Sequence, residues 1–361
     1  MGQKLNFSID HIDPLGQGVH KDESGVFFIP KTLPGDKGIA EVVKRSKGVH
    51  FAQLIELTEE SEHRIKPECE HFSSCPGCQF LHTNYDYELE TKKNSLIRML
   101  KPLDVNQVTS HEAPRRFSYR NRMQLHYDLD ENKLGLRIPS GIVSIPKCKL
   151  PNARLIHAFQ ELQLNWKDLV MDQGQPRRGH IEIYTQSNGT VQTSINKPYA
   201  DGGFTQVFAQ MNEKAISVVQ DFTAKLEIKT CLDLFGGSGN LSRHLESNTL
   251  VVDSATPSLE LTAHQKFYQL DLFSNSALHA LQEKVHPPID LMLVDPPRSG
   301  FQGLEKFIEA YDPKYLVYMS CFAPTMIRDL RQLKKMQLEV HLLDFFPSTH
   351  HLETLALIKL K

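Results

Sequence analysis

Residues 230–240 read Thr-Cys-Leu-Asp-Leu-Phe-Gly-Gly-Ser-Gly-Asn and decide the fold of the C-terminal part of this chain. A short apolar run ends here in a glycine-rich turn, and a helical pattern follows at Leu241–Leu245. Glycines let the backbone turn tightly and approach a ligand, while a helix start presents free N–H groups. The pattern predicts a strand, a ligand-binding turn and a helix, although glycine turns also occur as plain packing devices.

Similar apolar runs recur after about residue 201, each followed by a helical pattern. Together with the first, we predict strands at 230–235, 249–253, 289–294, 315–319 and 352–360. Strands that alternate with helices indicate a doubly wound, Rossmann-like α/β domain with a largely parallel sheet, which we place at 201–361. Ligands of such sheets bind outside the carboxyl ends of the strands.

Two acidic residues at later strand ends sharpen the interpretation of the glycine turn. Asp253 is placed to hold ribose hydroxyls, and Asp271 to meet an adenine edge. The turn lacks the spaced Gly-x-Gly-x-x-Gly that favours a dinucleotide. Ribose binding without a pyrophosphate loop points to S-adenosylmethionine rather than NAD.

Three further residues at strand ends could carry chemistry. Two prolines fix the backbone after Asp295 and hold its carboxylate at the rim of the sheet, unless Asp295 simply caps the next helix. Cys321 lies between a strand and a helix, where a thiol pKa can be lowered, although a lone Cys is more often core filler. Glu353 precedes an apolar strand, where a raised pKa suits a general base, or it is a solvated strand residue. Because Cys321 and Asp295 end strands of one sheet, we expect both to face one crevice.

Four of the six cysteines form a set of three close residues and one distant residue: Cys69, Cys75, Cys78 and Cys148. The N-terminus lacks the apolar core of a signal peptide, so we expect a cytoplasmic protein in which disulfides do not form. Four thiolates satisfy either a [4Fe-4S] cluster or a structural zinc ion. Zinc sites usually show two close pairs, so the three-plus-one spacing favours the cluster.

The N-terminal part has a different texture. Residues 1–58 alternate apolar and polar positions between turns, as in 25–30 and 38–44, which predicts a small β-barrel. Residues 59–200 form a mixed α+β central domain. We predict in it a helix from about 84 to 100 and strands at 122–127, 141–145 and 179–185.

Charge and hydropathy exclude some classes of function. With 41 Lys and Arg against 43 Asp and Glu, the net charge of −2 gives no global attraction to nucleic acid. Basic residues outnumber acidic ones only locally, between His111 and Arg154, a segment that is either an electropositive face around Arg115–Arg122 or a solvated strand face. No apolar run approaches the roughly 18 residues of a membrane span, so we expect no membrane partner.

In this order, the motifs resemble the RNA 5-methyluridine methyltransferases, specifically the bacterial 23S ribosomal RNA branch with an N-terminal OB-like TRAM barrel and an iron-sulfur cluster. The resemblance covers nearly the whole chain. It is carried by Gly16–Val19, Leu33–Asp36, the cysteine set, Phe117–Met123, Phe204–Phe208, the glycine turn, Asp295-Pro-Pro-Arg, Ser320-Cys321 and His351–Thr354. The chain departs from the family pattern at Phe322, where Asn is usual, at Gly237, where Cys is frequent, and at Asp253, where Glu is usual.

The resemblance implies a class I methyltransferase in which Cys321 is the nucleophile, Glu353 the base, and Asp295 positions the flipped uracil or the sulfonium. It implies contacts to S-adenosylmethionine from Gln206, Phe235, Asn240, Asp253, Asp271 and Asp295, and a [4Fe-4S] cluster on Cys69, Cys75, Cys78 and Cys148. The expected partner is RNA, foremost 23S rRNA, and the expected state is a monomer. The alternatives are a tRNA uridine-C5 methyltransferase and a non-catalytic RNA-binding or iron-sulfur redox protein on the same fold.

Overall fold

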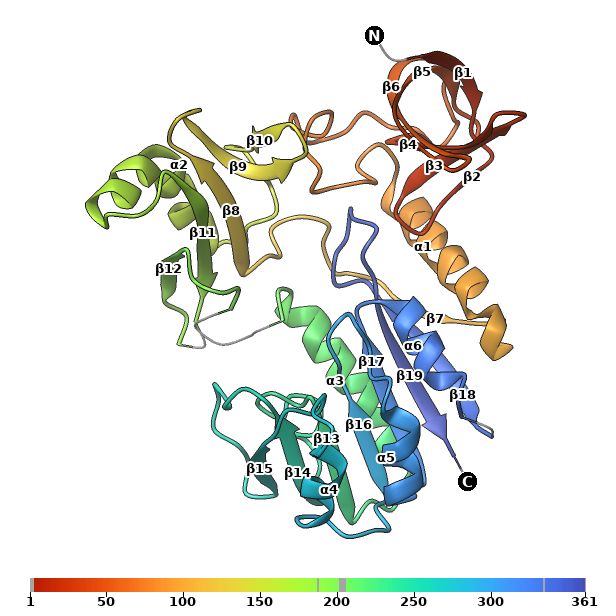
Figure 1. Ribbon diagram of the computed structural model, residues 1–361, viewed down its shortest axis with the longest axis vertical. Coiled ribbons are helices and arrows are strands. Elements are labelled where there is room, and N and C mark those ends of the chain that lie inside the picture. The colour runs from red at the N-terminus through yellow and green to blue at the C-terminus, as the bar shows by residue number, and fades with distance from the viewer. Residues whose placement is uncertain (1–2, 187, 201–205, 334, 361) are drawn as a thin grey trace. The chain divides into compact units, whose positions relative to one another are not determined.

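The computed structural model describes residues 3–186, 188–200, 206–333 and 335–360, which form two compact units (Figure 1). The first unit contains residues 1–95, 114–199 and 346–350, and the second contains residues 96–113, 200–345 and 351–361. Residues 96–113, which the sequence analysis assigns to the central domain, fold with the second unit. They do so because β7 (Thr109–His111) pairs with β18 (Gln337–Leu343) at the edge of its sheet.

Six strands form the N-terminal sheet of the first unit, in the order β1-β5-β6-β4-β3-β2. Their bounds are β1 (Lys4–Ser8), β2 (His11–Ile12), β3 (Gln17–Asp22), β4 (Gly25–Pro30), β5 (Lys37–Ser46) and β6 (Val49–Glu59). Side chains from alternate positions fill its core: Phe7, Ile9, Phe27, Ile29, Ala40, Val42 and Ala52. The strands predicted at 25–30 and 38–44 are confirmed.

A second sheet of the first unit has five antiparallel strands in the order β10-β9-β8-β11-β12. They are β8 (Arg122–Asp128), β9 (Lys133–Ile138), β10 (Gly141–Ser144), β11 (Arg178–Thr185) and β12 (Val191–Ile195). Helix α2 (Leu155–Asp172) packs on this sheet because Leu155, Phe159, Leu162, Trp166 and Val170 recur every three or four residues and share one apolar face. Helix α1 (Tyr85–Leu100) confirms the predicted helix, and the short 3-10 helix η1 (Lys101–Leu103) follows it.

The second unit is built on an eight-stranded sheet in the order β15-β14-β13-β16-β17-β19-β18-β7. Its other strands are β13 (Thr230–Leu234), β14 (Asn248–Asp253), β15 (Gln265–Gln269), β16 (Leu291–Val294), β17 (Tyr315–Ser320) and β19 (Glu353–Lys359). The helices are α3 (Ala209–Thr223), α4 (Ala277–Gln282), α5 (Leu304–Tyr311) and α6 (Ala323–Leu330). All five strands predicted from the sequence are confirmed within two residues, and the α/β class with them.

The helix predicted at Leu241–Leu245 is wrong, because consecutive turns span residues 237–244. Gly239 adopts a left-handed conformation (φ +70°), which turns the chain away from helical geometry. The Ser242 hydroxyl then donates a 2.5 Å hydrogen bond to the Asp233 carboxylate. Among the described residues, no helix combines the length and the apolar character needed to cross a membrane.

Candidate functional site

One edge of the eight-stranded sheet gathers the residues that the sequence places at strand ends. Strands β13, β14, β16 and β17 are parallel, so Asp253, Asp295 and Cys321 end or follow their strands at the same edge. Strand β19 runs antiparallel to β17 and β18 and starts there, since Glu353 pairs with the last residue of β18. Glu353, at the start of β19, therefore lies at the same edge of the sheet as Asp295 and Cys321, which follow the ends of β16 and β17.

Cys321, Glu353 and Asp295 lie close enough for their charges to interact, and Arg298 acts on both Cys321 and Glu353. Glu353 is 5% exposed, and this burial raises its pKa well above the usual range, with repulsion from Asp295 adding to the effect and Arg298 opposing it. The raised pKa predicted for this carboxyl is confirmed. Burial also raises the pKa of Asp295 to about 7, and the charge of Asp253 adds to the rise.

The thiol of Cys321 does not behave as the sequence suggested. Burial raises its pKa to about 11, Glu353 and Asp295 add to the rise, and Arg298 opposes it. The lowered pKa predicted for a thiol before a helix is therefore wrong, because burial and two carboxylates outweigh the start of α6. To become a thiolate, this group needs a proton acceptor and a compensating cation nearby.

The glycine turn after β13 has the backbone geometry of a ligand loop. Phe235 and Gly237 both have left-handed φ angles, +57° and +54°, and a Cβ atom at Gly237 would meet no atom within 4 Å. The Gly237 N–H donates to Asp253 Oδ2 at 3.0 Å, and the Ala255 N–H donates to Asp253 Oδ1 at 2.9 Å. Asp253 thus ties the turn to the end of β14.

The other predicted cofactor contacts are placed differently. The Asn240 amide exchanges two hydrogen bonds with Asn212 of α3, at 2.8 and 3.1 Å, so its polar atoms are engaged within the protein. Asp271 lies two residues after β15 and accepts the Phe273 N–H at 3.0 Å. Gln206 is half-buried before α3, while Phe204 and Thr205 of the same motif lie outside the described residues.

Sequence reasoning missed two features beside the turn. Phe273 is 54% exposed, and its ring lies 5.4 Å from that of Phe235, centroid to centroid, which offers an aromatic surface for a purine. Asp233 is buried inside β13, and burial raises its pKa to about 7, with Asp295 and Asp253 adding to the rise. An aromatic residue two positions after a strand-end Asp, and an Asp in an apolar strand, are the signals that could have revealed them.

The cysteine set lies within the first unit. The charges of Cys75, Cys78 and Cys148 interact with one another and with Cys69, so the structure gathers all four residues from two separate segments. Lys31, which directly follows β4, donates hydrogen bonds to the carbonyls of Phe72, Ser73 and Cys75 and anchors the first segment; those to Ser73 and Cys75 are 2.9 and 3.2 Å long. Among the described residues, no three His, Cys, Asp or Glu side chains are arranged to hold a metal ion.

Oppositely charged residues flank the first and last cysteines of the set. The first segment reads Glu68-Cys69-Glu70 and the second reads Lys147-Cys148-Lys149. Lys147 Nζ lies 3.1 Å from Glu70 Oε2, and Lys149 Nζ lies 3.9 Å from Glu68 Oε2. The Lys147 N–H also donates to His71 Nε2 at 3.1 Å. These pairs align the two cysteine segments side by side.

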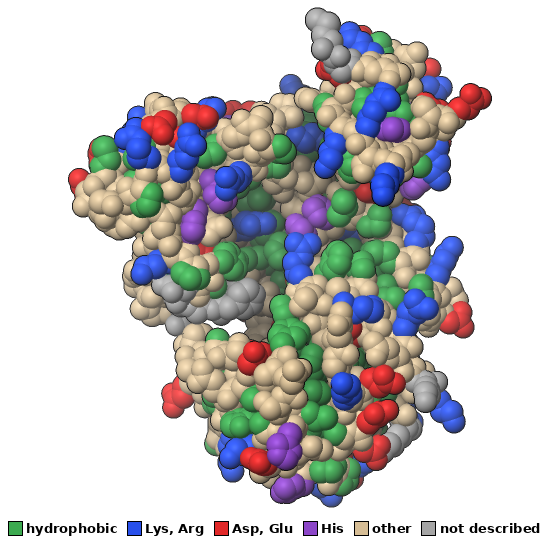
Figure 2. Space-filling view, in the orientation of Figure 1, with side chains coloured by type: hydrophobic (Ala, Val, Ile, Leu, Met, Phe, Trp, Pro, Cys, Tyr) green, Lys and Arg blue, Asp and Glu red, His purple; other side chains and the backbone are tan. Residues whose placement is uncertain are grey.

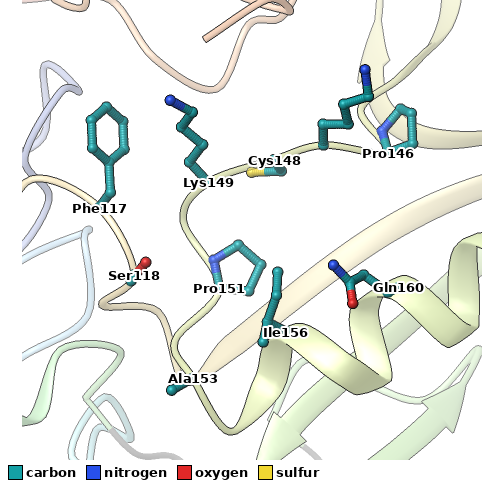
Figure 3. Close-up of a pocket in the computed structure, with 10 residues that line it drawn as sticks. Phe117, Ser118, Pro146, Cys148, Lys149, Pro151, Ala153, Ile156 and Gln160 are labelled. Atoms are coloured by element: carbon teal, nitrogen blue, oxygen red, sulfur yellow. The ribbon is translucent and has the colours of Figure 1, made fainter. Parts of the chain in front are cut away.

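A pocket of about 420 Å³ opens beside Cys148 (Figure 3). Its lining combines apolar walls with polar and basic groups: Phe117, Ser118, Pro146, Lys147, Cys148, Lys149, Pro151, Ala153, Ile156 and Gln160. Lys149 Nζ lies 5.5 Å from the centre of the Phe117 ring. Cys148 is thus the member of the set that borders a pocket, whereas Cys75 and Cys78 are buried.

The predicted electropositive face around Arg115–Arg122 holds only in part. Arg115 is exposed, but Arg122 is 2% exposed and pairs with the buried Glu182 at 2.8 Å. Arg116 pairs with the buried Glu88 at 2.7 Å. The face shown in Figure 2 has basic and acidic side chains interspersed, in keeping with the net charge of −2.

Comparison with known proteins agrees with this site. A family model described as tRNA (Uracil-5-)-methyltransferase matches residues 283–361, the part that carries Asp295, Cys321 and Glu353. The 23S rRNA (uracil(1939)-C(5))-methyltransferase RlmD of Shewanella halifaxensis is 26% identical over 441 aligned positions, which cover 100% of this chain and 97% of the relative. An uncharacterized RNA methyltransferase of Bdellovibrio bacteriovorus is 25% identical, over 99% of this chain and 95% of its own.

The fold has a full-length counterpart among solved structures. The tRNA (uracil-54, C5)-methyltransferase of Pyrococcus abyssi, in complex with S-adenosyl-L-homocysteine, matches with a TM-score of 0.74 and 22% identity over 98% of this chain and 100% of that chain. This likeness shows the α/β methyltransferase fold. With the family model over residues 283–361 and the full-length relatives, the resemblance to the RNA 5-methyluridine methyltransferases is confirmed.

Proposed function

We propose that this protein methylates C5 of a uridine in RNA, and that the RNA is 23S rRNA. The observation that carries the proposal is the meeting of Cys321, Glu353 and Asp295 at one edge of the sheet. A thiol and a buried carboxylate are the nucleophile and the base that uracil C5 chemistry requires. The relatives named for 23S rRNA support the choice of RNA.

Cys321 and Glu353 divide the chemistry between them. The Cys321 thiolate adds to C6 of the uracil, which makes C5 nucleophilic. S-adenosylmethionine, when bound, supplies an electrophilic methyl group. Once C5 has taken the methyl group, with S-adenosylhomocysteine as the leaving group, Glu353 takes the C5 proton and Cys321 leaves C6 by elimination, which restores the C5=C6 double bond. Asp295 beside them orients the base that has left its stack in the RNA.

The residues around the glycine turn fit S-adenosylmethionine. The open space at Gly237 leaves room for a ligand against the backbone, and Asp253 and Asp271 are acceptors for ribose hydroxyls and the adenine edge. Phe235 and Phe273 offer apolar rings. Asn240 reaches the ligand only if its pairing with Asn212 opens, and Gln206 completes the assigned set.

We assign a [4Fe-4S] cluster to Cys69, Cys75, Cys78 and Cys148. Soft thiolates suit iron-sulfur clusters or zinc, and a four-iron cluster holds its ligands farther apart than one zinc ion with Zn–S bonds of about 2.3 Å. The gathering of four cysteines from two segments supports the assignment, and their three-plus-one spacing favours the cluster over zinc. When bound, the cluster would cross-link the two segments. We further propose that residues 1–58 form a TRAM-type RNA-binding barrel, and that 59–200 and 201–361 are the central and catalytic domains, except that residues 96–113 fold with the catalytic domain.

The test is methyl transfer from tritiated S-adenosylmethionine to rRNA and tRNA from cells that lack the gene, followed by mapping of the methylated uridine. Incorporation into 23S rRNA supports the proposal, and incorporation into tRNA alone supports the second candidate, which the description of the family model favours. No incorporation into either would favour a non-catalytic RNA-binding or redox protein. We also propose that the protein acts as a monomer in the cytoplasm.

A further inference from the structure

The charge of Arg298 acts on both Cys321 and Glu353, and its side chain is exposed to solvent. An exposed arginine loses rotamer freedom only when something holds it. Phe322, the residue directly after the nucleophile, provides a surface: the Arg298 guanidinium lies 5.4 Å from the centre of its ring. This distance is within the range of a cation–π contact.

The backbone of the loop that carries Arg298 is fixed to α6. The Thr325 hydroxyl reaches the Arg298 carbonyl at 3.2 Å, and Arg328 Nη2 donates to the Ser299 carbonyl at 2.8 Å. Gly300 has a φ of +72°, and a Cβ atom there would lie 2.8 Å from Thr325 Cβ. Loop and helix are therefore in close contact, so only the long Arg298 side chain still needs to be oriented.

Phe322 itself is held in one conformation. It has an extended backbone (φ −146°, ψ 90°) immediately before α6, its N–H donates to Ser320 Oγ at 3.1 Å, and its carbonyl accepts the Thr325 hydroxyl at 2.8 Å. The position is also one where this chain departs from the family pattern, which has Asn there. An amide has no aromatic face, so an Asn at this position could not make the contact with Arg298.

We propose that Phe322 is a positioning residue that holds the Arg298 guanidinium toward Cys321, and that Arg298 is the cation that balances the charges of Cys321, Glu353 and Asp295. The carboxylates of Glu353, in β19, and Asp295, which follows β16, are the anions that face the Cys321 thiol. When Cys321, Glu353 and Asp295 are all ionised, they carry three negative charges, and the positive charge of Arg298 offsets one of them. The catalytic part of this inference rests on the proposed function, whereas the contact does not.

The experiment measures the rate of alkylation of Cys321 by iodoacetamide against pH, read by mass spectrometry of the Cys321 peptide. Thiolate is the reactive form, so the profile reports the pKa of this thiol without any RNA. Phe322→Leu is expected to slow alkylation at a fixed pH by about two- to fivefold, the size of one exposed cation–π contact. Phe322→Tyr, which keeps the aromatic face, should restore the wild-type profile.

The decisive variant removes the cation. Arg298→Gln should slow alkylation at least as much as Phe322→Leu, and adding Phe322→Leu to Arg298→Gln should change nothing further. The proposal would be overturned if Phe322→Leu slowed alkylation of Cys321 equally in the wild type and in Arg298→Gln. It would also be overturned if Phe322→Leu did not slow alkylation at all. If Phe322→Leu fails to fold by thermal melting, Phe322→Trp should instead speed alkylation, because Trp binds cations best. Failure of the wild type to methylate any RNA would overturn the proposed function and leave these alkylation results standing.

Discussion

The sheet edge with Cys321 and Glu353 and the region of the four cysteines are assembled by different means. At the sheet edge, the backbone ladder of β17 and β19 determines where each side chain emerges. In the cysteine region, residues 69–78 and 146–149 share no strand or helix and meet through contacts such as Lys147–Glu70. A backbone ladder survives a change of side chain, but a side-chain contact does not. Substitutions should therefore alter chemistry at the first region and assembly at the second.

The largest effect is expected for Cys321→Ala. It should lower methyl transfer by at least about 10⁴-fold, because the variant lacks the thiol proposed to activate C6. Thermal stability and binding of S-adenosylhomocysteine should stay near wild type, since β17 and its neighbours keep their backbone pairing. Residual transfer within tenfold of wild type would show that the thiol is not the nucleophile.

Glu353→Gln should lower turnover by about 10²- to 10⁴-fold, the usual contribution of a general base. The expected product is distinctive, because the proton is removed only after addition and methyl transfer. Methylated RNA should stay covalently attached to Cys321 and survive a denaturing gel. Thr354→Ser, a change at the next residue that keeps the hydroxyl bonded to the Ser320 carbonyl, is the matched control and should yield free product. If Glu353 has no part in catalysis, Glu353→Gln should also yield free methylated RNA and no covalent adduct.

Much of this sheet edge could be predicted from the sequence, because apolar runs and the residues that end them are local signals. The orientation of β19 could not, since antiparallel pairing with β17 depends on residues more than 30 positions apart. The pKa of Cys321 was predicted in the wrong direction for the same reason. Its neighbours Glu353 and Asp295 come from other strands, and their effect adds to burial only once the chain has folded.

The cysteine region shows the opposite balance. Spacing identified all four cysteines, but nothing local indicated how Cys148 reaches Cys69. The answer lies in the flanking charges, Glu68 and Glu70 against Lys147 and Lys149, whose match appears only when the two segments are read together. The sequence also did not reveal that Arg122, on a strand with alternating burial, points inward to Glu182.

Asp233 tests whether burial of a carboxyl in β13, with Asp295 and Asp253 nearby, makes its ionisation costly to the fold. Its pKa is raised to about 7, so between about pH 4 and 7 the folded protein holds a proton that the unfolded chain releases. The free energy of unfolding should therefore fall as pH rises through this window, by up to about 4 kcal/mol for this group.

Asp233→Asn should make that pH slope shallower in urea unfolding followed from pH 4 to 8. Asp290→Asn is the control, because Lys314 and the Lys229 and Thr230 N–H groups, despite partial burial, lower the Asp290 pKa to about 2. The stabilisation that ionised Asp290 contributes to the free energy of unfolding is present above about pH 4 and is lost only as the pH falls toward 2. Identical slopes for the wild type and Asp233→Asn would contradict the raised pKa of Asp233.

The smallest effect should come from the charged pairs that flank Cys69 and Cys148. The four side chains are 45–72% exposed, so each ion pair contributes about 0–1 kcal/mol to the docking of the Cys148 segment. The charge reversals Lys147→Glu and Lys149→Glu, made together, should therefore weaken this docking only several-fold. In anaerobically purified protein, the visible absorbance of the proposed cluster should then decay several times faster in air. Adding Glu68→Lys and Glu70→Lys restores opposite charges and should return the decay to near wild type, although none of these residues is a ligand. Cys148→Ser marks the limit of full lability, because the remaining thiols all come from one segment. The absorbance of the variant with all four charges exchanged could instead decay as fast as that of the variant with only the two lysines reversed. In that case the two segments are aligned by contacts of the backbone, such as Lys147 N–H to His71, and the cysteine region resembles the sheet edge more than its side chains suggest.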